Sequence, residues 1–301
     1  MIDDFNPFKI SLEEELQRNP QLKVDDIKNL QVWLKDQPSF PKMYDEQLCQ
    51  FAHACYYDVE ETKKTLQYFF KYKASMTEFF SGWDPNSPEL HSYVDSVLYA
   101  AVLPRHSLDE QQILVLKLKD TVPENYDFAT SVKWLIMTVS RLQMEQGTQP
   151  GFILVYDGTG YTFSHVLRNP LSLVKNYIQF GENASSIRVT EIHFINSSSI
   201  VKKMINLLKP LLDKDLMKMM TIHTSAEAFF KNIPPTRVPE DYGGTAQTMA
   251  ELHKENVDQM KKARLEMLGQ EKLCGNDIKK EATKKKSEKK IETSFRHLEL
   301  D

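Results

Sequence analysis

Residues that could carry chemistry are scattered along the chain, and few of them share a recognised spacing. One glycine motif follows an apolar run, at residues 157–163 (DGTGYTF). It begins like the fingerprint of dinucleotide-binding folds, but Phe163 occupies the place of the third glycine, which those folds need for close helix–strand packing. The motif therefore favours a tight turn after a strand, with glycines at positive φ, over a nucleotide site.

The other candidates for catalysis or metal binding are equally isolated. The sequence has no phosphate-cradling P-loop, no H-E-x-x-H motif and no G-x-S-x-G motif. Histidines stand at positions 53, 91, 106, 165, 193, 223, 253 and 297. His193 and His223 fall on expected strands, and neither has a cysteine or carboxylate at a recognisable ligand spacing. We expect no catalytic residues, no metal and no cofactor, although distant residues can still meet in a fold.

The composition excludes several classes of protein. The 301 residues carry a formal net charge of −4, and 41% of them are apolar, enough for one sizeable core. The longest apolar run, Val97–Leu103, is far shorter than the roughly 20 residues of a membrane span. Residues 1–10 (MIDDFNPFKI) are acidic and include no apolar signal segment, so we expect no secretion. Cys49, Cys55 and Cys274 fit free thiols in a reducing compartment. These features predict a cytoplasmic protein that does not bind nucleic acid.

Charge is distributed unevenly along the chain. Residues 279–290 contain seven Lys and two Glu, a local charge of +5, which leaves −9 for the rest of the chain. Such a run is typical of a solvated tail. The alternative is attraction to an acidic membrane, worth about 1 kcal/mol per residue near the surface.

Apolar periodicity predicts a helical N-terminal part followed by an α/β layer. Early apolar positions recur at helical spacing, Asp58 with Glu61 forms a capping pattern, and residues 81–90 (SGWDPNSPEL) are typical of a linker. Short apolar runs predict strands at 97–103, 113–118, 152–156, 192–194 and 220–223. Helical segments between them favour largely parallel pairing. We expect a helical domain (1–80), a linker (81–95), an α/β domain (96–246) and a C-terminal helix with a Lys-rich tail (247–301).

The segment Ile200–Leu212 has an unusually wide apolar face. At 100° per residue the apolar side chains cover an arc of about 160°, and Lys202, Lys203, Asn206 and Lys209 occupy the other side. Pro210 is placed to kink or stop this helix. The pattern is typical of a surface helix packed on a core. The alternative is a helix whose face covers a cavity or meets a membrane.

Four segments together carry a resemblance to a known family. They are residues 152–165 (FILVYDGTGYTFSH), 191–196 (EIHFIN), 209–212 (KPLL) and 238–244 (VPEDYGG). In this order and spacing they resemble the CRAL-TRIO family, in the group that includes tocopherol-transfer and retinaldehyde-binding proteins. The similarity covers roughly residues 25–245, and residues 45–72 resemble the small helical domain that precedes the lipid-binding domain. The ending, residues 294–301 (SFRHLELD), is similar to that of insect members.

The resemblance implies an α/β fold in which a mixed, largely parallel sheet floors an apolar pocket beneath a mobile gate helix. The gate face would comprise Ile200, Val201, Met204, Ile205, Leu207 and Leu212. The expected pocket lining is Phe128, Val132, Leu135, Ile136, Val139, Leu154, Tyr156, Phe180, Ile187, Ile192, Phe194, Leu208 and Leu211. Each of these is equally plausible as a core residue. A ligand's polar head could bind Tyr156, Ser131, Thr138 or Ser140.

The sequence departs from the family at one surface. Tocopherol-transfer members hold phosphoinositide phosphates on a basic patch, whose matching positions here are Cys55, Thr190, Asp215, Met219 and Arg188. Phosphate binding favours Arg and Lys, and Arg188 alone keeps its charge, so we do not expect this patch to bind phosphoinositides. More diffuse contacts with anionic lipid are expected from Arg188, Lys202, Lys203, Lys209, Lys214 and Lys218.

These observations predict a monomeric carrier that visits membranes and binds a tocopherol-, retinoid- or carotenoid-like lipid. Burial of a few hundred Å² of ligand, at roughly 25 cal/mol per Å², gives several kcal/mol before ordering costs. Gate opening at a membrane would release the ligand. One alternative is a signalling adaptor that docks on membranes or proteins, with an incidental pocket. Another is a nucleotide-dependent lipid-modifying enzyme, which would need a phosphate site.

Overall fold

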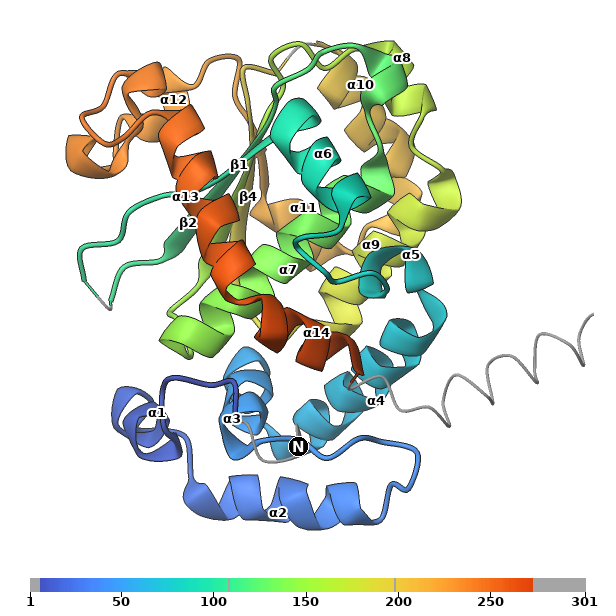
Figure 1. Cartoon of the computed structure of the whole chain (residues 1–301), viewed down its shortest axis with the longest axis vertical. Helices are drawn as coiled ribbons and strands as arrows, with labels where there is room; N and C mark the ends of the chain where they lie inside the picture. Colours follow the sequence, from blue (N-terminus) through green and yellow to red (C-terminus); the bar gives the residue numbers. More distant parts are fainter. Residues whose placement is uncertain (1–5, 108, 198, 273–301) are drawn as a thin grey trace, which may run out of the picture.

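A five-stranded sheet with helices on both faces forms the centre of the computed structural model, which describes residues 6–107, 109–197 and 199–272 (Figure 1). The strands are β1 (Leu98–Val102), β2 (Gln112–Leu118), β3 (Phe152–Asp157), β4 (Val189–Ile195) and β5 (Met220–Ile222). They lie in chain order, with β1 antiparallel to β2 and every later pair parallel. The predicted mixed, largely parallel α/β fold is therefore confirmed.

Parallel pairing requires long crossovers, and helices supply them. The crossovers contain α7 (Phe128–Gln146), then α8 (Phe163–Leu167) with α9 (Leu171–Ala184), and finally α10 (Ser199–Leu208) with α11 (Lys214–Met219). The opposite face of the sheet packs against α12 (Glu227–Phe230) and α13 (Met249–Lys262). Side chains alternate between the faces, so Leu154 and Tyr156 face the crossover helices while Val155 packs towards α12 and α13.

The N-terminal helices build a second apolar core at one end of the molecule (Figure 1). They are α1 (Leu12–Arg18), α2 (Val24–Lys35), α3 (Asp45–Ala54) and α4 (Val59–Ser75), whereas α5 (Thr77–Phe80) and α6 (Pro88–Val97) pack into the core between the sheet and the crossover helices. The carboxylate of Asp58 accepts a hydrogen bond from the Glu61 amide at 2.9 Å, which caps α4 as its sequence predicts. The buried carboxylate of Glu15 accepts a hydrogen bond from the Thr148 amide at 2.8 Å and joins this core to the α/β part.

The segment predicted as a linker, residues 81–95, is packed in the structure and contains most of α6. Trp83 is 2% exposed, and Leu90 and Val94 are buried at helical spacing. Pro88 occupies the first turn of α6, where a missing N–H costs nothing. The glycine and prolines of this segment therefore do not mark an exposed linker. They lie at the start of a packed helix.

Two further element boundaries differ from the sequence predictions. The helix expected over Ile200–Leu212 ends at Leu208, and Pro210 lies in a 3₁₀ turn, η2 (Lys209–Leu211), because proline cannot continue the α-helical hydrogen bonds. The single C-terminal helix expected after residue 247 is divided at Ala263 into α13 and α14 (Arg264–Lys272). Residues 279–290, Cys274 and His297 lie outside the described residues.

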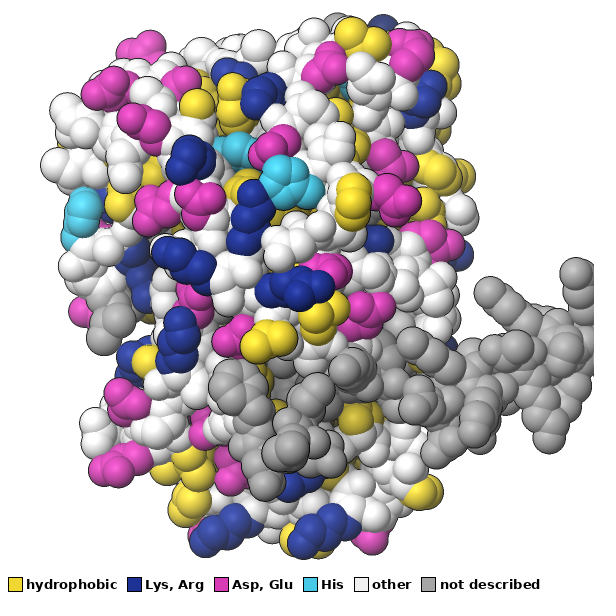
Figure 2. Space-filling model, in the orientation of Figure 1, with side chains coloured by type: hydrophobic (Ala, Val, Ile, Leu, Met, Phe, Trp, Pro, Cys, Tyr) yellow, Lys and Arg dark blue, Asp and Glu magenta, His cyan; other side chains and the backbone are white. Residues whose placement is uncertain are grey.

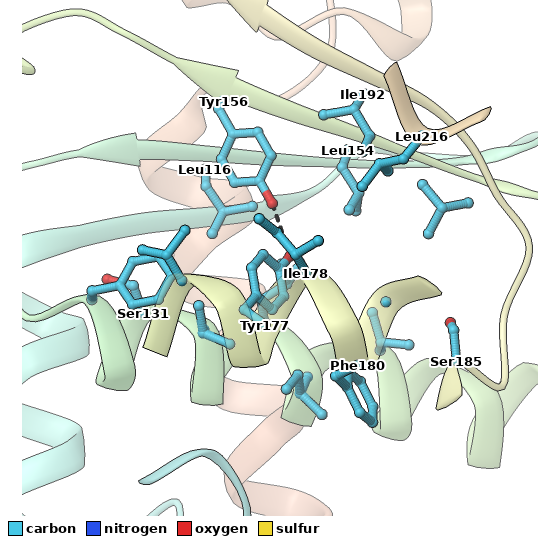
Figure 3. A pocket seen from close by; sticks show the side chains of 18 of the residues that line it. Leu116, Ser131, Leu154, Tyr156, Tyr177, Ile178, Phe180, Ser185, Ile192 and Leu216 are labelled. Carbon is cyan, nitrogen blue, oxygen red and sulfur yellow. Dashed lines mark hydrogen bonds between the residues drawn. The ribbon is translucent and has the colours of Figure 1, made fainter. Parts of the chain in front are cut away.

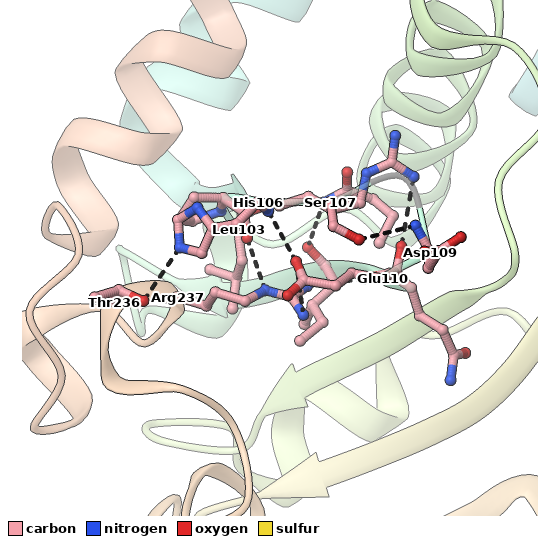
Figure 4. Close-up of polar contacts among 12 residues, drawn as sticks. Leu103, His106, Ser107, Asp109, Glu110, Thr236 and Arg237 are labelled. Atoms are coloured by element: carbon pink, nitrogen blue, oxygen red, sulfur yellow. Dashed lines mark hydrogen bonds and ion pairs between the residues drawn. The ribbon is translucent and has the colours of Figure 1, made fainter.

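A polar clamp fastens the segment after β5 to the loop between β1 and β2 (Figure 4). The buried guanidinium of Arg237 donates to the carbonyl oxygens of Pro104 and Gln111 at 2.9 and 2.8 Å, and Glu110 lies 3.4 Å from it. His106 contacts the hydroxyl of Thr236 at 3.2 Å. This histidine therefore has a structural role, since its partners hold a loop.

The stability of the N-terminal core should depend on pH through His53. Burial, with nearby Arg188, lowers its pKa from 6.5 to about 4. Because the unfolded chain takes up this proton and the folded chain does not, stability should fall by about 3 kcal/mol as pH drops from 7 to 4. Urea unfolding at pH 7, 5 and 4 measures this loss. His53→Gln, which cannot be protonated there, should show a shallower pH dependence; parallel curves for both proteins would contradict the assignment.

Candidate ligand-binding site

A cavity of about 800 Å³ lies between the sheet and the crossover helices α7, α9 and α10 (Figure 3). Its floor consists of alternate residues on three adjacent strands: Leu116 of β2, Leu154 and Tyr156 of β3, and Ile192 and Phe194 of β4. The period of two along each strand places these side chains on one face of the sheet. The volume falls within the range of pockets that hold small organic ligands.

Helix α7 forms a long apolar wall. Its first turn is fixed by Asp127, whose carboxylate accepts a hydrogen bond from the Thr130 amide at 2.7 Å. Residues spaced three or four apart then present one face to the cavity. These residues are Phe128, Val132, Leu135, Ile136 and Val139.

Helix α10 and the turn that follows it cover the opposite side. Val201, Met204, Leu208 and Leu212 line the cavity, and Leu207 lies at its margin, with 69% of its surface exposed. Lys202 and Lys203 are exposed on the outer side of the helix. The wide apolar face is therefore divided between an inward and an outward part.

The structure places every predicted apolar lining residue around this cavity except Leu211. Of the predicted gate face, Ile200 and Ile205 also fall outside the lining. Among the polar candidates, Tyr156, Ser131 and Ser140 line the cavity, but Thr138 does not. The Thr138 hydroxyl is instead buried 3.3 Å from the side-chain nitrogen of Asn256 on α13.

The cavity also contains residues that the sequence did not reveal. Tyr177 and Ile178 of α9 point into it (Figure 3), and the N-terminal part closes one end with Phe69, Phe80 and Trp83. The apolar periodicity of residues 171–180 carried a signal for α9. The sequence carries no signal that the N-terminal helices close the cavity, because that closure depends on how two separate cores pack together.

Two tyrosine hydroxyls meet across the cavity (Figure 3). The hydroxyl oxygens of Tyr156, on β3, and Tyr177, on α9, lie 3.0 Å apart. Burial raises the pKa of both, so each remains a neutral hydroxyl at physiological pH. Ser131, the other polar candidate on this side, is already paired with Tyr93 at 2.7 Å.

The glycine motif after β3 forms a structural turn. Gly160 adopts a φ of 75°, which glycine tolerates without strain. Burial alone would raise the pKa of Asp157, but hydrogen bonds from Thr159, Tyr242 and Asn196 outweigh it and lower that pKa. The motif thus ties the β3 turn to β4 and to the closing segment of the domain.

A histidine pair lies on the other face of the sheet. His193 of β4 and His223, directly after β5, have ring nitrogens 2.9 Å apart, and the other nitrogen of His193 lies 2.7 Å from the Glu191 carboxylate. The sequence analysis missed this carboxylate, which stands two positions away on the same strand. No group of three residues suited to a metal occurs among the described residues.

The charged residues near the gate differ in availability. The Arg188 guanidinium donates to the His53 carbonyl at 2.7 Å and stacks 4.2 Å from the Tyr56 ring, while Lys218 pairs with Asp215 at 2.6 Å. Lys202, Lys203, Lys209 and Lys214 are exposed. On the face shown in Figure 2, acidic and basic side chains intermingle, which gives no single-sign field on that face.

Large apolar side chains are exposed beside the cavity. Phe163 and Leu167 of α8, Leu171 of α9 and Leu207 of α10 line its margin, and 55% to 71% of each is exposed. We call these four residues the apolar rim. Within the described residues, no helix combines the length and the hydropathy that crossing a bilayer requires.

Comparisons with known proteins agree with this architecture. The CRAL/TRIO domain family matches residues 98–244, and the Pinta-like UBA domain family matches residues 19–90. Residues 98–244 therefore form a CRAL/TRIO domain.

Known proteins resemble the chain at low identity over most of its length. Human alpha-tocopherol transfer protein-like is 24% identical over 237 residues, which cover 77% of this chain and 68% of the relative. Clavesin-1 of Mus musculus is 21% identical over 236 residues, covering 77% and 66%. The crystal structure of Sfh5 aligns with a TM-score of 0.48 at 13% identity, covering 83% of this chain and 82% of that one.

Proposed function

We propose that this protein binds one hydrophobic small molecule in the cavity and transfers it between membranes, without covalent chemistry. The observation that carries the proposal is a cavity of about 800 Å³ with a mainly apolar lining. A signalling adaptor with an incidental pocket would be favoured by polar side chains filling that space, and the lining residues are mostly aliphatic and aromatic. Tocopherol-, retinoid- and carotenoid-like lipids are the ligand classes that the family suggests.

Ligand exchange in this proposal requires movement of α10. Its inward residues Val201, Met204 and Leu208 cover the cavity, so displacing the helix exposes both the ligand and an apolar surface. Exposure of that surface to water is unfavourable, whereas a bilayer accommodates it. A membrane that contacts the apolar rim therefore stabilises the open state, and the exposed lysines on α10 favour an anionic surface.

Native mass spectrometry of the purified protein, followed by lipid extraction, tests the proposal. We expect a stoichiometric apolar ligand to be retained, or to be accepted from vesicles containing retinol. Leu208→Asp should lower retention at least tenfold, because the carboxylate would replace an apolar contact with the ligand by a charge that loses hydration.

Leu211→Asp is the matched control, since Leu211 follows three residues later in η2 and does not line the cavity. It should retain ligand close to the wild-type level. A wild-type protein that never retains or accepts an apolar ligand would refute the proposal, and equal losses in both variants would show that α10 does not cover the ligand.

A further inference from the structure

The tyrosine pair in the cavity has an unbalanced count of hydrogen-bond donors. Each hydroxyl has one proton and two acceptor lone pairs. At an oxygen–oxygen distance of 3.0 Å, one hydroxyl of Tyr156 and Tyr177 donates to the other. This contact uses one of two protons. No other hydrogen bond reaches either hydroxyl from the residues that the structure describes.

The apolar surroundings of the pair favour a ligand that can accept a hydrogen bond from the second proton. The pair lies among Leu116, Leu154 and Ile178, and Phe194 stacks on Tyr156 with ring centroids 5.4 Å apart (Figure 3). A donor in apolar surroundings gains more from a partner than a donor in water does.

We infer that the Tyr156–Tyr177 pair is a recognition site for one neutral acceptor oxygen, which makes the preferred ligand an apolar alcohol, ether or carbonyl compound and not a carboxylate. The inference rests on the proposed ligand-binding function and specifies its ligand class. Volume adds a size limit: at roughly 30 Å³ per non-hydrogen atom, the share of a water in the liquid, about 800 Å³ corresponds to about 27 atoms.

Among the described residues, the three cations that line the cavity are already engaged. Lys73 donates to the Gln270 carbonyl at 2.6 Å, Lys117 lies 3.8 Å from the Asp157 carboxylate, and Arg188 donates to the His53 carbonyl. A fatty acid would therefore have to lose its charge or disrupt one of these contacts to bind. The tyrosine pair offers a neutral ligand its hydrogen bond without such a cost.

Three probes with one branched carbon skeleton test the inference: phytol, phytane and phytanate. Their affinities are measured by displacement of the neutral fluorophore N-phenyl-1-naphthylamine from the full chain. For the wild-type protein we expect phytol to bind about fivefold more tightly than phytane, the effect of one net hydrogen bond. Phytanate at neutral pH should bind at least tenfold more weakly than phytol.

The donor count predicts an unusual pattern for the variants. Tyr156→Phe and Tyr177→Phe each leave one hydroxyl whose proton is free, so each single variant should keep the preference for phytol. The double variant has no proton left, and its phytol-to-phytane affinity ratio should fall to about one. Tyr99→Phe, on the opposite face of the sheet, controls for loss of a tyrosine hydroxyl, and thermal unfolding checks that every variant is folded.

Several results would overturn the inference. A wild-type ratio near one would do so, as would a preserved ratio in the double variant. A preference for phytanate would place the head group at Lys73, Lys117 or Arg188 instead. Failure of the wild-type protein to bind all three probes and the fluorophore would reject the proposed function itself, and the inference with it.

Discussion

The double variant Ile178→Trp/Gly181→Trp should bind retinol at least tenfold more weakly than the wild-type protein. Both positions line the cavity from α9, one turn apart on the same face. A Cβ atom added at Gly181 would meet no atom within 4 Å, so a side chain can be introduced there without an immediate clash. A tenfold loss corresponds to about 60 Å² of unburied ligand surface at roughly 25 cal/mol per Å², which two indoles exceed.

Stability should change little in this variant, because the new side chains fill space instead of displacing neighbours. Replacing glycine by tryptophan inside a helix also removes part of the helix-propensity penalty of glycine, which is about 1 kcal/mol relative to alanine. Ile178→Val/Gly181→Ala is the matched control, since it alters the same positions without filling the cavity. Fluorescence titration with retinol measures the affinities. Wild-type affinity in the tryptophan variant would show that the ligand does not occupy this cavity.

The fold could be predicted because its elements depend on local periodicity. The apolar run that begins at Phe152 is a largely buried strand between β2 and β4, and the spacing of Phe128, Val132 and Leu135 has the period of one helix face. Parallel pairing followed from the helices between the strands. Glycine and proline were less reliable as signals of a loop, because Pro88 starts α6 within a segment whose composition is that of a linker.

The cavity could not be separated from a core by sequence, since both are lined by the same residue types. Leu208 lines the cavity and Leu211, one turn later, does not, because Pro210 changes the chain direction between them. Thr138 lies on the same helix as Ser131, but its neighbour is Asn256 of α13. Periodicity indicates the direction of each side chain, but it does not indicate whether a cavity or a packed neighbour lies in that direction.

Contacts between elements were also beyond the sequence. Tyr156 was a candidate for the head group of the ligand, but its partner Tyr177 belongs to a different element, and their distance depends on how α9 packs on β3. His193 and His223 meet for the same reason, because β4 and β5 pair in register. The tyrosine pair gives the cavity its polar character, and only the assembled fold shows either pair.

Substitutions in the apolar rim should weaken membrane docking more than they weaken ligand binding. In the variant Leu167→Asp/Leu207→Asp, we expect retinol transfer between phosphatidylcholine–phosphatidylserine vesicles to slow at least tenfold. The two leucines are 71% and 69% exposed on α8 and α10, where they contact little of the protein. Burying a leucine in an apolar phase is worth about 1.5 to 3 kcal/mol, and an aspartate there is unfavourable and repels anionic lipid.

Leu265→Asp is the matched control for this variant. Leu265 is 72% exposed, but it lies on α14, away from α8 and α10 (Figure 1). The same change of residue and charge therefore occurs outside the apolar rim, and transfer should stay near the wild-type rate. If the control slowed transfer equally, general repulsion between the protein and anionic lipid would explain the loss. If the double variant kept the wild-type rate, ligand exchange would have to use another surface, because the proposed membrane contact that opens α10 includes these two leucines.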